Sequence, residues 1–298
     1  MVKLGVIGGS GAKEVAAALG SGTEVKTVSV ELSDHSLVSV DFLNFNYGDT
    51  EVYFVLRHGK HHSDLLAKLD QRGIFNFLYA NGVKDVILTS ATGSLDTSVK
   101  LVDEGGMVVN SGVMRGFGYK GLSFNYPTNP HAVLANPYHA DLRRLLLDSV
   151  AAVPNTTAYD GGLYIQSEGN SFESPAEIAD LVCRLDTPVA RYRELQVWKE
   201  QGVEVSTEEL ALYQRLAQNL NRQHAQVSMN AVRSTILALE NSMRVGLVSF
   251  PVNYGAGLIP EEKVDHERTM QVIQKAVEPY ITPFLKNVIM KAPEYVTK

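Results

Sequence analysis

The chain has 298 residues, of which 45% are hydrophobic, and it carries a formal charge of −6 at pH 7. This composition allows one large core or two modest ones and excludes a largely disordered chain. The acidic balance gives no general attraction to nucleic acid or to an anionic membrane, so we expect neither as a partner.

Cysteine content and apolar runs narrow the class further. The single cysteine, Cys183, excludes an internal disulfide framework and a cysteine-based zinc site. No apolar run approaches the about 20 residues that span a bilayer. The N-terminal segment MVKLGVIGGSG reaches its glycines too early for a secretory signal. We therefore expect a cytoplasmic protein.

Short apolar segments rich in β-branched residues alternate with amphipathic segments along the chain. We expect strands over residues 3–8, 24–30, 37–45, 51–57, 83–95, 105–113, 161–167, 224–230 and 244–257. We expect helices over 64–82, 138–153, 231–241 and 261–290. This alternation predicts an α/β protein with a mixed β-sheet flanked by helices, folded as one domain over 1–298.

Two segments stand outside this alternation. Residues 114–137 form a long stretch rich in proline and asparagine, a candidate lid or subunit contact. Residues 185–222 are polar and helix-compatible, with Tyr192, Leu195 and Trp198 among charged residues. We expect this second segment to be a helical insertion that packs on the body or on another subunit.

The first candidate anion site is the glycine turn VIGGSG at 6–11, which ends a strand and precedes a helix-compatible segment. Free backbone N–H groups at a helix start favour an anion, and Ser10 adds a hydroxyl donor. A dinucleotide site is the rival, with Glu31 as the ribose-binding acid, but the turn lacks the G-x-G-x-x-G spacing. A tight turn without a ligand is the simplest alternative.

The second candidate is the loop LRHGKHHSD at 56–64, where a strand delivers Arg57 and His58. The guanidinium is a fixed fork of donors suited to a phosphate oxygen. His58, His61 and His62 lack helical spacing and a carboxylate partner, so we expect no metal there. The alternative is a solvated basic loop.

Two further stretches place polar residues at strand ends. LTSATGSL at 88–95 ends an apolar strand with small residues, and ligands of open α/β sheets lie outside such carboxyl ends. Ser90, Ala91 and Thr92 leave room for a ligand against the backbone. EGNSFESPAEI at 168–178 follows the apolar run GGLYIQS, and its Ser-Pro-Ala-Glu portion predicts a helix start.

These motifs in order, together with VSMNAVRSTILA at 227–238 and the Asn-Tyr pair after GLVSFPV, resemble the nucleoside phosphorylase family. That family includes purine nucleoside phosphorylase and methylthioadenosine phosphorylase. The resemblance covers nearly the whole chain and implies a distorted, barrel-like sheet core. It also implies a pentosyltransferase of purine salvage, a homotrimer that uses phosphate as co-substrate and needs no other cofactor.

The resemblance assigns residues to three parts of a site. The phosphate ligands it implies are Ser10, Arg57, His58, the backbone at Ala91, and Asn230. The purine contacts are Phe172, Glu173 and Asn253. The ribose contacts are Met229, His266 and His62. Of these, Asn253, Glu173 and His58 are the implied catalytic residues.

Three of these residues predict a 6-oxopurine nucleoside such as inosine or guanosine. By this resemblance, Glu173 would accept a hydrogen bond from N1–H, a proton that adenine lacks. Asn253 would donate to the developing charge at N7, and His266 would meet a sugar 5′-hydroxyl. The residues taken alone also allow Met229 to be ordinary core packing, Asn253 to be a turn residue, and His266 to be a surface or capping residue.

The chain departs from the family pattern at three places. Asn170 replaces a proline, Asn230 replaces a phosphate-binding hydroxyl residue, and Arg233-Ser234 replaces a Pro-Glu pair. Three other functions therefore stay open: phosphorolysis of methylthioadenosine or methylthioinosine, nucleoside binding with weakened catalysis, and hydrolysis by water.

Overall fold

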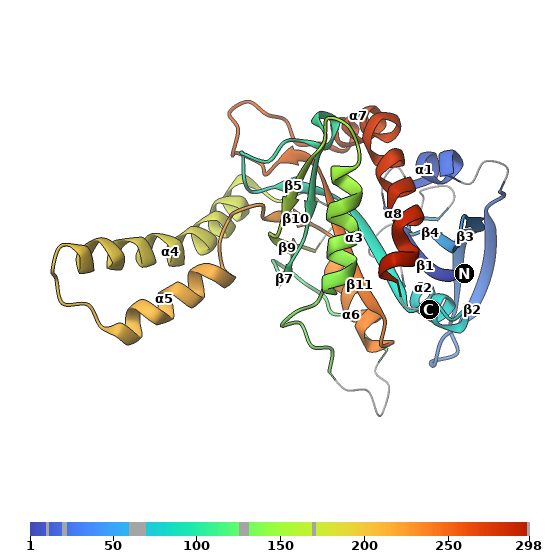
Figure 1. Cartoon of the computed structure of the whole chain (residues 1–298), viewed down its shortest axis with the longest axis horizontal. Coiled ribbons are helices and arrows are strands. Elements are labelled where there is room, and N and C mark those ends of the chain that lie inside the picture. Colours follow the sequence, from blue (N-terminus) through green and yellow to red (C-terminus); the bar gives the residue numbers. More distant parts are fainter. Residues whose placement is uncertain (10–11, 20–22, 60–69, 125–130, 169–170, 297–298) are drawn as a thin grey trace.

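A computed structural model describes residues 1–9, 12–19, 23–59, 70–124, 131–168 and 171–296. The described residues form an 11-stranded mixed sheet with helices on both faces (Figure 1). The strands are β1 (Val2–Gly8), β2 (Lys26–Glu31), β3 (Leu37–Tyr47), β4 (Thr50–Leu56), β5 (Asp85–Ser94), β6 (Gly106–Val109), β7 (Gly112–Arg115), β8 (Thr157–Asp160), β9 (Leu163–Gln166), β10 (Gln226–Ser228) and β11 (Arg244–Tyr254). The predicted mixed α/β fold is confirmed.

The centre of the sheet is parallel. Strand β1 pairs with β4 on one side and with β5 on the other, and β5 also pairs with β11 in parallel. Their carboxyl ends therefore meet at one edge, where an α/β sheet commonly receives a ligand. Strands β2 and β3 extend this centre as an antiparallel meander, and β10 joins β5 to β9 and β7.

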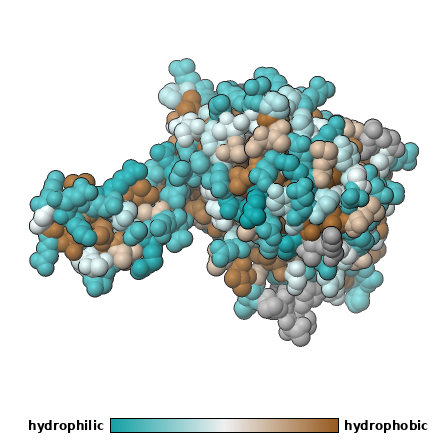
Figure 2. All heavy atoms as spheres, in the orientation of Figure 1, coloured by the Kyte–Doolittle hydropathy of each residue, from teal (hydrophilic) through white to brown (hydrophobic). Residues whose placement is uncertain are grey.

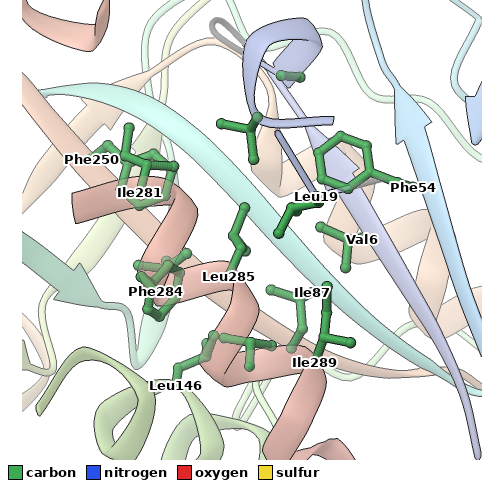
Figure 3. Packing of buried hydrophobic residues seen from close by; sticks show 14 of the residues in the cluster. Val6, Leu19, Phe54, Ile87, Leu146, Phe250, Ile281, Phe284, Leu285 and Ile289 are labelled. Carbon is green, nitrogen blue, oxygen red and sulfur yellow. The ribbon is translucent and has the colours of Figure 1, made fainter. Parts of the chain in front are cut away.

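Alternation along the strands sends apolar side chains to two cores. Ile87 of β5 enters a large core with Phe54, Leu146 and Phe284, between the sheet and a helical layer (Figure 3). The helices whose residues belong to this core are α1 (Ala12–Leu19), α3 (Ala140–Ala151), α7 (His266–Ala276) and α8 (Thr282–Tyr295). In Figure 1, α3 and α8 lie side by side.

The opposite face carries the second core. Val86 and Leu88 of β5, the neighbours of Ile87, pack there with Phe75 and Leu237. The helices are α2 (Arg72–Ala80) and α6 (Ala231–Glu240). A small third cluster joins the ends of β5, β9 and β10 to the start of α4 (Pro175–Glu200). Helix α6 therefore lies directly behind the carboxyl ends that are expected to hold a ligand.

Several boundaries differ from the sequence prediction. The expected strand 105–113 is two strands, because Asn110 bonds to Leu247 while Ser111 bonds to Gly162, so the chain changes partners there. Strand β8 was not predicted. The expected long helix 261–290 starts at His266 and contains a π-helical turn, Val277–Ile281. Part of the expected helix 64–82 lies outside the described residues. Within the described residues, no helix is long and apolar enough to cross a bilayer.

The segment 185–222 contains the second half of α4 and helix α5 (Thr207–Asn219), which project from the body as a two-helix arm (Figures 1 and 2). Arg191 joins the two helices, with ion pairs to Glu194 and Glu209 and its guanidinium over Trp198. Leu195 is fully buried in the arm, whereas Val197 and Leu212 are 47% and 45% exposed. That this segment is an insertion stays a prediction.

Removing the arm should leave the body folded. Ala190 and Gln218 line the same cavity of about 730 Å³ at the arm's base, so a short Gly-Ser linker can join them. Because the deleted residues 191–217 belong to none of the three apolar clusters, we expect the melting temperature to change by less than about 4 °C, or about 1 kcal/mol. Calorimetry measures this.

The matched control is Leu285→Ala, which empties a buried site on α8 and should cost about 2–5 kcal/mol. A shortened chain that unfolds without a cooperative transition would mean that the arm is part of the folding unit.

Candidate active site

Arg57 is a charged side chain buried without a counter-ion. It follows β4 directly, is 2% exposed, and has no carboxylate partner within the described residues. Its Nη2 donates to the carbonyl oxygen of Thr89 at 3.2 Å. Its Nε and Nη1 find no hydrogen-bond partner in the described part of the chain. Burial lowers the pKa of this guanidinium, but arginine stays protonated at neutral pH, so the described residues leave this buried cation without a counter-charge.

The glycine turn leaves room for the end of the Arg57 side chain. A side chain at Gly9 would place its Cβ 2.4 Å from Arg57 Nη2, closer than non-bonded atoms approach. The backbone N–H of Arg57 donates to the carbonyl oxygen of Gly8 at 3.1 Å, which ties the two strand ends together. A residue larger than glycine at position 9 would therefore displace the end of the Arg57 side chain. Ser10 itself lies outside the described residues.

Tyr164 of β9 is fully buried, and its hydroxyl group forms several hydrogen bonds beside these strand ends. Its hydroxyl lies 2.9 Å from Ser90 Oγ on β5, and it accepts from the backbone N–H groups of Asn230 and Ala231 at 3.4 and 3.2 Å. The first N–H groups of α6 are thus already occupied by a side chain. An anion near this helix would be held by side chains such as Arg57 rather than by the free helix start.

Asn230 and its neighbours form one wall of the site. Asn230 stands at the N-cap position of α6 without a side-chain capping bond, is 7% exposed, and has an Oδ1 atom with no partner among the described residues. Met229 precedes it in the turn after β10 and is half-buried. The half-buried Ala91 lies opposite, and its carbonyl oxygen accepts from Ser228 Oγ at 2.8 Å. Strand β10 therefore joins the Asn230 turn to the end of β5.

Glu173 is a half-buried carboxylate with one fully buried oxygen. Its Oε1 is buried without a hydrogen-bond partner among the described residues. Burial raises the pKa of this carboxyl above its ordinary value of 4.5, while its own backbone N–H and the Ser167 hydroxyl favour the charged form less strongly. The adjacent Phe172 is 39% exposed. A buried acceptor next to an accessible aromatic ring suits a flat ligand that carries an N–H donor.

The helix start predicted after Glu173 is confirmed. Ser174 caps α4 and accepts from the N–H of Glu177 at 3.3 Å, while Glu177 Oε2 accepts from the N–H of Ser174 at 2.8 Å. This capping box, with Pro175 at the first helical position, fixes the chain immediately after Glu173.

Asn253 lies at the same edge of the sheet as this helix start. It is 5% exposed, pairs with Gly93 of β5, and its Nδ2 donates to the carbonyl oxygen of Tyr254 at 2.7 Å. The glycines beyond it pack on α4, since a Cβ at Gly255 or Gly257 would lie 3.0 Å from Ile178 or Pro175. The end of β11 therefore runs alongside the first turn of α4.

The remaining predicted residues are placed unequally. His58 is half-buried in the turn after β4, next to Arg57. His266 is exposed at the first position of α7, where Asp265 rather than His266 is the cap. No hydrogen bond within the described residues joins His266 to Met229, Glu173 or Asn253. His62 and Asn170 lie outside the described residues. The described residues contain no cluster of His, Cys, Asp or Glu that could hold a metal.

Sequence reasoning missed two residues of β9. Tyr164 and Gln166 were read as part of an apolar strand, yet both are fully buried and both bind the start of α6. Their spacing of two puts them on one face of the strand. The sequence did contain one signal: the Tyr164 hydroxyl and the Gln166 amide are polar groups on a strand face that is expected to be apolar.

The fold and site define an α/β protein with a buried arginine directly after β4 and a half-buried carboxylate on the segment that follows β9. A family model described as the phosphorylase superfamily matches residues 3–281, and the chain belongs to that superfamily.

Relatives extend over the full length. The chain is 26% identical over 306 residues to a Thermococcus kodakarensis protein named "Probable 6-oxopurine nucleoside phosphorylase", covering 100% of this chain and 94% of the relative. It is 27% identical to the 6-oxopurine nucleoside phosphorylase of Pyrococcus furiosus, over 93% of this chain and 89% of that protein. A solved structure of Schistosoma mansoni methylthioadenosine phosphorylase with adenine matches at a TM-score of 0.72 and 18% identity, covering 99% and 93% of the two chains. This last likeness confirms the fold.

Proposed function

We propose that the chain catalyses phosphorolysis of a 6-oxopurine nucleoside such as inosine or guanosine, giving the free base and ribose 1-phosphate. A phosphate oxygen bonds to the sugar C1′ as the bond from C1′ to the purine nitrogen breaks. The electron pair of that bond goes to the purine, which then takes up the proton that phosphate loses. Positive charge develops on the sugar and negative charge on the base.

The observation that carries this proposal is the buried, uncompensated cation at Arg57. A charge that is 2% exposed, with two nitrogens that have no hydrogen-bond partner among the described residues, costs free energy unless an anion completes it. In our proposal phosphate is that anion, with His58, Ser10, Asn230 and the backbone at Ala91 as further ligands. Binding pairs the guanidinium and aligns the nucleophile in one step.

The residues proposed to contact the purine are suited to the negative charge that develops on the base. Glu173 accepts from N1–H, which holds a 6-oxopurine against Phe172. Asn253 donates its amide to N7, where negative charge accumulates as the bond breaks. Met229, His266 and His62 contact the ribose. The names of the Thermococcus kodakarensis and Pyrococcus furiosus relatives support a 6-oxopurine substrate.

The rest of the proposal is inferred from the family resemblance. We propose a homotrimer in the cytoplasm that requires no metal or organic cofactor. Phosphate reaches the site already ionised, so no group is needed to activate it as a nucleophile.

Base release from inosine tests this function. We expect hypoxanthine and ribose 1-phosphate to form at least about 100-fold faster with phosphate than in phosphate-free buffer, because phosphate is the nucleophile that completes the site. A coupled assay for hypoxanthine measures the rate. Undiminished release without phosphate would indicate a hydrolase, and purine binding in calorimetry without any release would indicate a binding protein.

A second candidate is phosphorolysis of methylthioinosine or methylthioadenosine. The exposed position of His266, with no bond to the other site residues in the described part, favours it because nothing fixes this residue as a 5′-hydroxyl contact. Turnover of inosine, adenosine, methylthioinosine and methylthioadenosine separates the base preference from the sugar preference. Preference for both methylthio sugars would remove His266 from the site.

A further inference from the structure

Arg233 occupies a position where the resemblance predicts proline, and here it makes contacts that proline could not. Its backbone N–H donates to Gln166 Oε1 at 3.1 Å, and a proline has no such hydrogen. Its guanidinium Nε donates to the carbonyl oxygen of Lys120 at 2.9 Å, and its Nη2 forms an ion pair with Glu168 Oε1. One residue of α6 therefore holds two other segments, residues 166–168 and the loop at Lys120.

The partners of Arg233 are connected to one another as well. Gln166 Oε1 also accepts from the N–H of Val232 at 2.9 Å, and Gln166 Nε2 donates to Glu168 Oε1 at 3.2 Å. The backbone N–H of Glu168 donates to the carbonyl oxygen of Phe117 at 2.9 Å. The side chains of Arg233 and Glu168 are only 10% and 15% exposed, so solvent does little to weaken this pair.

This network joins the two halves of the proposed site. Arg233 lies three residues after Asn230 and four after Met229, on the helix whose start forms the phosphate and ribose wall. Glu168 lies four residues before Phe172 and five before Glu173, on the segment that carries the purine contacts. A shift between these walls would separate the leaving base from its nucleophile, and misplacement by about 1 Å can cost about 100-fold in rate.

We infer that Arg233 is a positioning residue which, through Glu168 and Gln166, sets the purine-binding segment at a fixed distance from the phosphate-binding turn. The inference rests on the proposed function for its catalytic consequence. Its structural content, a clamp between α6 and the residues Gln166 and Glu168, stands on the hydrogen bonds alone.

The test compares Arg233→Gln with a matched control, Arg143→Gln. Arg143 also donates through Nε to a backbone carbonyl, that of Asn110 at 3.1 Å, and through Nη2 to a carboxylate, Asp160. It has no link to the site. We expect Arg233→Gln to lower kcat/KM for inosine about 10- to 100-fold, with a raised nucleoside KM, and Arg143→Gln to stay within about twofold of wild type.

Two further variants separate positioning from general stability. Glu168→Gln should lose as much kcat/KM as Arg233→Gln, and the double variant should lose no more than the worse single variant. Arg233→Lys keeps the positive charge but lacks the planar guanidinium with its several N–H donors, so it should recover only part of the lost kcat/KM. Folded Arg233→Gln protein with wild-type kcat and KM would overturn the inference, as would equal losses in Arg143→Gln.

Amide hydrogen exchange provides a readout that does not need turnover. We expect faster exchange at Phe172–Ile178 in Arg233→Gln, or in Arg233→Lys if the glutamine variant does not fold, and no such change in Arg143→Gln. If the wild-type protein releases no base with phosphate, the proposed function fails while this comparison still tests the clamp. Unchanged exchange at Phe172–Ile178 would overturn the clamp itself.

Discussion

We expect Arg57→Met to stabilise the ligand-free protein while removing most of its phosphate-dependent turnover. The guanidinium is buried with two unpartnered nitrogens and no carboxylate partner in the described residues, so in the absence of an anion it opposes folding. Methionine fills a similar volume without the charge. Replacing poorly compensated buried charge with apolar volume typically gains about 1–4 kcal/mol. Loss of one preorganised donor to the reacting group should lower kcat/KM for phosphate at least about 100-fold.

Phosphate itself provides the sharpest readout of this variant. A ligand that binds the folded state alone stabilises it by about 2.7 kcal/mol when its concentration is 100 times its Kd. Phosphate should therefore raise the melting temperature of the wild-type protein and leave that of Arg57→Met unchanged. Thermal denaturation with and without phosphate, in a buffer that contains no other oxyanion, measures both effects.

Arg244→Met is the matched control. Arg244 is also partly buried, but it pairs with Asp85, whose side chain is 0% exposed, at 2.5 Å. Its removal takes the guanidinium partner away from a buried carboxylate, so we expect a loss of about 3–5 kcal/mol. Phosphate should still stabilise that variant. If Arg57→Met is destabilised like Arg244→Met, Arg57 is a structural residue and the anion site is wrong.

The sequence predicted the fold well because its strands are buried and strongly β-branched. Strands β1, β4, β5 and β11 each read as an apolar run, since parallel strands covered on both faces need no polar alternation. Strand β8, by contrast, has only four residues, TAYD, and alternates between half-buried and exposed. A strand of that kind differs little from a loop in one sequence, and only its pairing with β6 defines it.

The site was predictable where its residues stand next to each other in the chain. Arg57 and Glu173 each lie in a conspicuous polar motif directly after an apolar strand. Tyr164 and Gln166 escaped notice because their partners, the N–H groups of α6, lie 66 or 67 residues away. Backbone groups of that kind leave no mark in a sequence. The contacts of Arg233 were missed for the same reason, although its replacement of a proline marked the position.

We expect Glu173→Gln to lower kcat/KM for inosine about 10- to 150-fold, the equivalent of about 1.5–3 kcal/mol for a charge-assisted hydrogen bond. The amide oxygen still accepts from N1–H but carries no charge. Adenosine and methylthioadenosine have no N1–H, so their turnover should change within about threefold. Steady-state kinetics with the four nucleosides measure the difference.

The pH dependence gives the same residue a second test. Burial raises the pKa of Glu173 above 4.5, so folding favours its protonated form. Its contribution to stability is therefore fully present below pH 4.5 and is lost as the pH rises through the raised pKa. Glu173→Gln removes this loss, and at pH 7 the ligand-free variant should be more stable than wild type. Purine binding requires the ionised carboxylate, so kcat/KM for inosine should fall as the pH drops through the same pKa, a limb absent from the variant.

Glu177→Gln is the control that separates this contact from general charge. Glu177 lies four residues further on, favours the protonated form of Glu173 through its own charge, and sits in the capping box of α4. Glutamine preserves a capping box, so the helix start should stay intact. We expect near-normal inosine turnover and an acid limb displaced to slightly lower pH, because one nearby negative charge has gone. Equal losses of kcat/KM for inosine and adenosine in Glu173→Gln would contradict the N1–H contact. Purine specificity would then rest on the shape of the site alone.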